Sequence, residues 1–124
     1  MKNVVFEDIP GNHIDNRRTL TTIFNTDISE FKVAAQVKVA TMKKTAKLGG
    51  HYHRYAELFT VLSGKAMFKL TDRDSGESHA FEIVPGKRLI IPAEVFHEAL
   101  VDKGTILLGL TEEPYISAEH NDLK

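Results

Sequence analysis

The sequence contains no cysteine, which excludes disulfide bonds, thiolate metal ligands and a cysteine nucleophile. It also has no apolar run close to the roughly 20 residues that a membrane-spanning helix needs. Its net charge is only -1, so no overall field draws the chain to nucleic acid or to a membrane surface. We therefore expect neither nucleic acid nor a membrane among its partners. Because no signal-like apolar stretch follows the first residues, we also expect a cytoplasmic protein.

Internal repeats, linkers and low-complexity tracts are absent as well. The 124 residues are 42% hydrophobic and 27% charged, which is the balance of a folded globular domain. This length is sufficient for one packed core without covalent cross-links. We therefore expect a single domain over residues 1–124.

Most of the chain alternates apolar and polar residues, and no segment has a long helical period. A period of two is typical of strands with one buried face. It is clearest in residues 31–43 and 65–71. The positions predicted to be buried are Val33, Ala35, Val37 and Val39 in the first segment and Ala66, Phe68 and Leu70 in the second.

Turn-forming residues divide the remaining chain into short pieces. Turns are predicted at residues 72–76, 85–86 and 103–104, where Gly, Pro and Asp gather. About eight short strands with frequent turns favour an all-β sandwich or barrel. The further predicted strands are an edge strand at 18–25, strands at 77–84 and 87–91, and a hairpin made of 97–102 and 105–111.

Three histidines and a glutamate are the residues best suited to chemistry. His51, His53 and Glu57 share parity, so on one strand their side chains point to the same side. With His97 they form a donor set for a divalent transition metal, and Fe, Mn, Ni, Cu and Zn all accept such ligands. Tyr55 has the same parity, so we predict it in the same site, as a candidate catalytic residue beside His51 and His53.

Two segments resemble the signature motifs of the cupin family. The first motif, His-x-His, three residues, Glu, six residues, Gly, matches from His51 to Gly64. The second motif, Gly, five residues, Pro, followed by a histidine, matches from Gly86 to His97. One difference is that Glu94 stands where the second motif has another glycine.

The cupin resemblance implies a fold and an assembly. The expected fold is a small antiparallel β-barrel, the double-stranded β-helix or jelly roll, with the metal in its mouth. The core barrel would cover about residues 31–111, with an N-terminal strand segment at 17–25 and a polar C-terminal tail at 112–124. Small cupins pair as dimers, often by exchanging N-terminal strands, so the resemblance also implies a homodimer.

A second resemblance concerns the substrate. Residues 15–20 and 28–39, together with the tail at 107–122, are similar to the dTDP-sugar 3,4-ketoisomerases and 3,5-epimerases. In those ketoisomerases the paired histidines move protons, usually without a metal. The resemblance therefore implies that His51 and His53 are an acid–base pair, a role that suits imidazole near neutral pH.

Three functions remain open at this point, each with a small molecule as the partner. The first is a metal-binding isomerase or epimerase that moves a proton beside the carbonyl of a sugar or sugar nucleotide. The second is a metal-dependent oxygenase acting on a small organic substrate. The third is a non-catalytic module that binds a metal or a ligand. All three use the same fold, so only the site can separate them.

Overall fold

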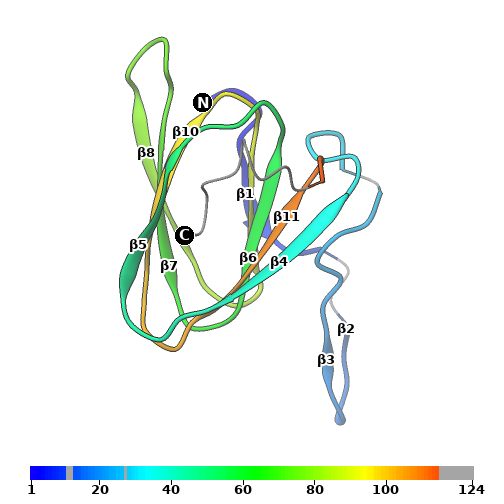
Figure 1. Cartoon of the computed structure of the whole chain (residues 1–124). Coiled ribbons are helices and arrows are strands. Elements are labelled where there is room, and N and C mark those ends of the chain that lie inside the picture. Colours follow the sequence, from blue (N-terminus) through cyan, green and yellow to red (C-terminus); the bar gives the residue numbers. More distant parts are fainter. Residues whose placement is uncertain (11–12, 27, 115–124) are drawn as a thin grey trace.

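Two antiparallel sheets lie face to face in the computed structural model, which describes residues 1–10, 13–26 and 28–114 (Figure 1). One sheet has five strands in the order β1-β9-β6-β11-β4, and the other has four in the order β5-β10-β7-β8. A separate pair, β2 and β3, forms a small hairpin. The strands are β1 (Val5–Asp8), β2 (His13–Ile14), β3 (Thr19–Leu20), β4 (Gln36–Thr41), β5 (Ala46–His51), β6 (Glu57–Ser63), β7 (Ala66–Thr71), β8 (Ser78–Ile83), β9 (Lys87–Ile91), β10 (Phe96–Val101) and β11 (Ile106–Thr111).

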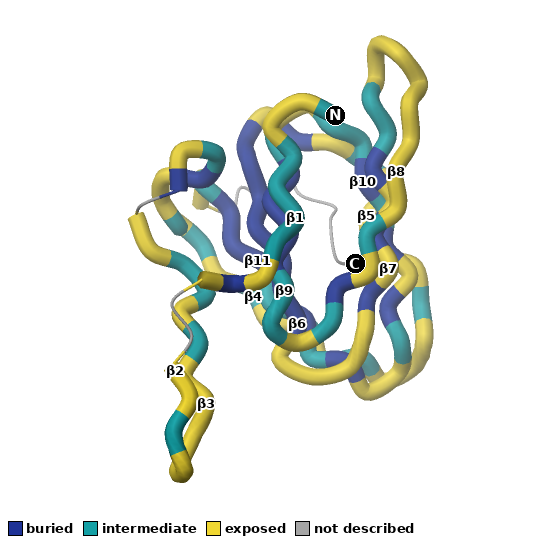
Figure 2. The backbone as a smooth tube through the Cα atoms, turned by 180° about the vertical axis from the view of Figure 1, so that it is seen from behind, coloured by how far each residue is buried: buried dark blue, intermediate teal, exposed yellow. Residues whose placement is uncertain are grey.

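The main core fills the space between the two sheets. Apolar side chains from both inner faces interdigitate there, as they do in a β-sandwich. The strand β7 contributes Ala66, Phe68 and Leu70, so its predicted alternation is confirmed. Figure 2 shows buried positions on β6, β10 and β11 around this space. The other members of the core are Phe59, Val61, Ile83, Leu89, Ile91, Ala99, Val101 and Leu107.

A second apolar cluster covers part of the outer face of the five-stranded sheet. Ile28 and Phe31 pack there against side chains of β6, β9 and β11. The covering segment is also tied to the sheet, because Arg88 donates from Nη1 to Ile23 O over 3.2 Å. Since both faces of β6 are covered, its first five residues are all buried.

The phase predicted for the strand in residues 31–43 is wrong. Val33, Val37 and Val39 are 53%, 58% and 57% exposed, although they were expected in the core. Ala35, the fourth of these positions, is exposed too. Among the described residues β4 is an edge of its sheet and pairs only with β11, and its valines are exposed. A period of two identifies a strand but does not state which face is covered.

Two further predictions about pairing are wrong. In residues 18–25 only Thr19–Leu20 forms a strand, which pairs with β2 in a hairpin that projects from the body (Figure 1). The turn at residues 103–104 exists, but β10 and β11 enter different sheets instead of forming a hairpin. The all-β, antiparallel jelly-roll prediction is confirmed as a sandwich. Among the described residues no ladder joins the two sheets, so the expected closed barrel is not formed.

Of the predicted tail at 112–124, residues 115–124 lie outside the described residues. In the described ranges there is no helix of sufficient length and hydrophobicity to span a membrane. The cytoplasmic location and the absence of membrane and nucleic-acid partners stay predictions.

Candidate functional site

His51 and His97 face each other across a strand pair. They are direct partners in the β5–β10 register, and their rings lie edge to face with centroids 4.9 Å apart. A bulge interrupts the pairing between His97 and Glu98, and bulges commonly re-aim side chains beside sites. Gly49 makes the close approach possible, because its φ is +83° and a Cβ there would lie 3.1 Å from His97 O. Gly49, two residues before His51, is a sequence signal that the periodicity argument missed.

His53 and Tyr55 lie on a connection rather than on a strand. Residues 52–56 cross from β5 in one sheet to β6 in the other, so His51, His53 and Glu57 do not share a strand as predicted. They nevertheless converge, because the crossing segment bends over the same end of the sandwich. The ring centroids of His51 and His53 are 4.5 Å apart, and Tyr55, which is buried, stacks on His53 at 4.7 Å.

Glu57 enters the site from the opposite sheet. It begins β6, is 3% exposed, and places Oε1 3.3 Å from His53 Nε2 and 3.2 Å from His97 Nε2. His97 Nδ1 donates to Val95 O over 3.3 Å, which leaves the lone pair of a neutral ring on Nε2. A carboxylate oxygen and a lone pair at this separation repel unless a positive charge lies between them. The arrangement therefore suits a proton on the imidazole or a metal ion.

The donor atoms lie close to the spacing that a metal site needs. The ligand nitrogens of His51, His53 and His97 all lie within 4.8 Å of one another. Two donors at about 2.1 Å from one ion and at right angles to each other are about 3 Å apart. The two glutamate–histidine separations are close to this value. Small side-chain rotations would bring the three imidazoles to the same ion.

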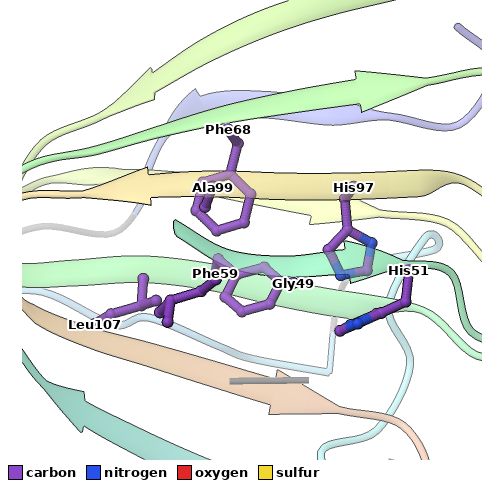
Figure 3. Close-up of a pocket in the computed structure, with 8 residues that line it drawn as sticks. Gly49, His51, Phe59, Phe68, His97, Ala99 and Leu107 are labelled. Atoms are coloured by element: carbon purple, nitrogen blue, oxygen red, sulfur yellow. The ribbon is translucent and has the colours of Figure 1, made fainter. Parts of the chain in front are cut away.

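An apolar pocket lies behind the histidines. Figure 3 shows the rings of His51 and His97 at one end and those of Phe59 and Phe68 further inside. The pocket is small, with a cavity volume of about 10 Å³, and continues to Leu107. In such surroundings an electrostatic interaction is stronger than in water, so charges that develop at the histidines interact strongly with their neighbours.

Four predicted ligands and Tyr55 are thus brought together, and their roles stay predictions. Arg73 was not predicted to lie beside the site. Arg73, from the β7–β8 loop, pairs with Glu94 at 2.6 Å and places its guanidinium carbon 3.6 Å from the centre of the Tyr52 ring. The signal available in the sequence was Glu94, the acid at a glycine position of the cupin motif.

Comparison with known proteins identifies the family. The family model for the polysaccharide biosynthesis C-terminal domain matches residues 13–106, which is most of the chain. The chain belongs to this family. No curated protein matches the sequence significantly. The matched range includes all the site residues, from His51 to His97.

Several solved structures are similar to this chain. The 3,4-ketoisomerase QdtA from Thermoanaerobacterium thermosaccharolyticum, in complex with TDP, is 25% identical with a TM-score of 0.81, over 96% of this chain and 87% of that one. A 3,4-ketoisomerase from Helicobacter canadensis is 19% identical with a TM-score of 0.81, over 94% and 87%. The dTDP-4-dehydrorhamnose 3,5-epimerase from Sulfolobus tokodaii is 18% identical with a TM-score of 0.83, over 95% and 74%. The last two share the fold, and the resemblance to sugar-nucleotide cupins seen in the sequence is confirmed.

Proposed function

We propose that this protein is an isomerase or epimerase that moves a proton beside the carbonyl of a sugar nucleotide. The observation that carries the proposal is the pair His51 and His53, whose rings lie 4.5 Å apart at the mouth of an apolar pocket. Support also comes from the 25% identity, over 96% of this chain, with a ketoisomerase whose structure holds TDP.

The reaction needs one group that accepts a proton and one that returns it. Removing the proton from a hydroxyl-bearing carbon beside a carbonyl gives an enediolate. Returning a proton to the former carbonyl carbon, while the hydroxyl proton passes to the former carbonyl oxygen, gives the keto isomer, and returning it to the opposite face of the original carbon gives the epimer. Imidazoles titrate near neutral pH, so His51 and His53 can act as base and acid in the two steps. Tyr55, stacked on His53, is a third candidate proton carrier. The buried Glu57 carboxylate, 3.3 Å from His53 Nε2 and 3.2 Å from His97 Nε2, can orient both rings.

We also propose that His51, His53, Glu57 and His97 hold a divalent transition metal. Such an ion would act as a Lewis acid that polarises a carbonyl. A nitrogen bound to an ion cannot carry a proton, so the metal content decides whether these histidines act as ligands or as acid and base. The oxygenase alternative depends on the same four donors, and the non-catalytic alternative on the same pocket.

Deuterium exchange tests the isomerase. The protein is incubated in D₂O with keto-sugars and TDP-linked keto-sugars, and the proton beside the carbonyl is followed by NMR. Exchange should require the protein, and His51→Ala should reduce its rate by about 10²–10⁴-fold, the usual contribution of an acid–base group. His79→Ala is the matched control, because His79 lies on the surface beside Glu77. No exchange with any keto-sugar, together with oxygen uptake on a phenol, thiol or diketone, would replace the isomerase by the oxygenase.

The proposed assembly is a homodimer. Apolar residues on the outer face of the five-stranded sheet are left uncovered at the β4 edge, where Val37 and Val39 are more than half exposed, and Leu62 is 52% exposed nearby. The projecting β2–β3 hairpin exposes Ile14 and Leu20 as well. A closed two-fold pair covers such surfaces and protects an edge strand from open-ended association.

A further inference from the structure

The segment that carries His53 is not held by a strand ladder. Residues 52–56 cross between the two sheets, so their position depends on contacts from neighbouring loops. One contact is a backbone hydrogen bond in which Glu94 N donates to His53 O over 2.7 Å. Glu94 lies on the loop that leads into β10 and His97. This bond therefore links the two segments that supply His53 and His97.

Glu94 has a backbone conformation that favours glycine. Its φ is +69°, in the left-handed region that a residue with a Cβ rarely adopts. The cupin motif has glycine at this position, and glycine would adopt the same φ without strain. The glutamate side chain has a use, however, because its Oε2 accepts a hydrogen bond from Arg73 Nη1 over 2.6 Å. Glu94 thus combines a strained backbone with an ion pair, beside the site.

Arg73 also contacts the segment that carries His53, through Tyr52. Its guanidinium lies over the Tyr52 ring, with the central carbon 3.6 Å from the ring centroid. Arginine can stack and form an ion pair at once because its charged group is planar. Tyr52 lies between His51 and His53 in the chain. We name the three residues Tyr52, Arg73 and Glu94 the Arg73 clamp.

The clamp contributes little to global stability. The Arg73 and Glu94 side chains are 42% and 51% exposed, and exposed ion pairs stabilise folded proteins weakly. Its effect is local, because it joins the β7–β8 loop to Tyr52, the residue before His53, and to Glu94, whose N–H binds His53 O. We infer that Arg73 and Glu94 are positioning residues, which hold the His53 imidazole where the proton transfer needs it. This inference rests on the proposed isomerase function.

Kinetics should separate positioning from a structural role. Glu94→Gly keeps the N–H that binds His53 O, removes the strain, and deletes the side chain that carries the carboxylate. We expect kcat to fall about 10-fold while KM changes less than about 2-fold, because a displaced acid–base group slows chemistry without weakening binding. The unfolding temperature should stay the same or rise. If activity simply followed stability, Glu94→Gly would be fully active, and that result would overturn the inference.

The matched variants are chosen around the same ion pair. Arg73→Ala should lower kcat at least as much as Glu94→Gly does, and the double variant should be no slower than Arg73→Ala, because Glu94→Gly removes only the ion pair that Arg73→Ala also removes. Arg73→Lys, which keeps the charge without the planar group, should restore part of the rate. Asp8→Asn is the control, since it breaks an exposed ion pair with Lys87 at 2.7 Å on another part of the sheet. Additive losses in the double variant would contradict a common clamp.

A readout without substrate keeps this test separate from the proposed function. The ring protons of His53 feel the ring current of Tyr55, which stacks on it at 4.7 Å and 13°. Their NMR resonances, assigned with a His53→Gln variant, should shift in Arg73→Ala and Glu94→Gly but not in Asp8→Asn. Unchanged resonances in both clamp variants would overturn the positioning role, whether or not isomerase activity is found.

Discussion

At the scale of the residue, the site is defined by an acid between two bases. The Oε1 atom of Glu57 lies within 3.3 Å of one nitrogen each from His53 and His97, and all three residues are buried. A buried carboxylate is costly unless it is compensated by positive charge. The compensating charge is the chemically important quantity here, and it is supplied either by protons or by a metal ion.

Metal analysis distinguishes these two cases. If the proposed metal is present, protein purified without added metal should contain about one divalent ion per chain by elemental analysis. His53→Ala and His97→Ala should each weaken binding by more than the roughly 10–100-fold that follows the loss of a supporting residue. His79→Ala should retain the ion. Stoichiometric metal in a His51→Ala/His53→Ala double variant would eliminate this site as the metal centre.

The loop that presents Arg73 has its own pH dependence. Asp72 accepts hydrogen bonds from the backbone N–H groups of Ser75, at 3.1 Å, and of Asp74, at 2.9 Å, and these bonds lower its pKa below the ordinary value. The bonds favour the ionised form, so their contribution is complete above the ordinary pKa of about 3.9. It is lost as the pH falls through the lowered pKa of the folded state.

Asp72→Asn measures this contribution, because asparagine retains an acceptor oxygen but does not titrate in this range. The free energy of unfolding of the wild type should fall more than that of the variant between about pH 6 and about pH 2. Urea unfolding of both proteins across that range gives the difference directly. A constant difference would mean that the loop does not depend on the Asp72 charge.

At the scale of the element, the turn between β6 and β7 is a tightly packed connection. Gly64 has a φ of +88°, and a Cβ there would lie 2.3 Å from Thr105 Oγ1 and 2.7 Å from Thr105 Cα. The Thr105 hydroxyl is itself fixed, since it accepts from Lys65 N and donates to Lys65 O, both at 3.1 Å. The last glycine of the first cupin motif is therefore required by packing.

Gly64→Ala should be strongly destabilising. We expect a loss of about 2–5 kcal/mol in the free energy of unfolding, from backbone strain and overpacking together. Gly76→Ala is the matched control, because Gly76 has a φ of +75° but an added Cβ there would meet nothing within 4 Å. It should lose only about 1–2 kcal/mol, the cost of the left-handed backbone. Equal losses in urea unfolding would mean that the contact with Thr105 is relieved by a small shift.

At the scale of the whole molecule, the exposed apolar surface predicts the assembly. Light scattering should give twice the 13.9 kDa mass of the chain at micromolar concentration. Val37→Lys combined with Val39→Lys should yield a monomer, since two charges would be buried in the interface. Met67→Lys with Leu100→Lys is the control, because these residues are exposed on the outer face of the other sheet. A wild-type monomer would exclude the dimer.

The local features of the fold followed from the sequence alone. The strands at Ala66–Thr71 and Lys87–Ile91 and the turn at 72–76 are found where they were predicted, because periodicity and turn chemistry act over a few residues. The same is true of the metal-type donor set, since the spacing of the cupin motifs names His51, His53, Glu57 and His97. These four side chains do converge, although His51, His53 and Glu57 do not lie on one strand as their parity suggested.

Only the tertiary structure decided which strands pair and which faces are covered. The strands β10 and β11 follow each other in the chain but enter different sheets, and β4 turns its valines outward. The contact of Arg73 with Tyr52 and Glu94 likewise joins three separate loops. Such pairings depend on contacts between residues far apart in the sequence, and a local pattern carries no information about its distant partner.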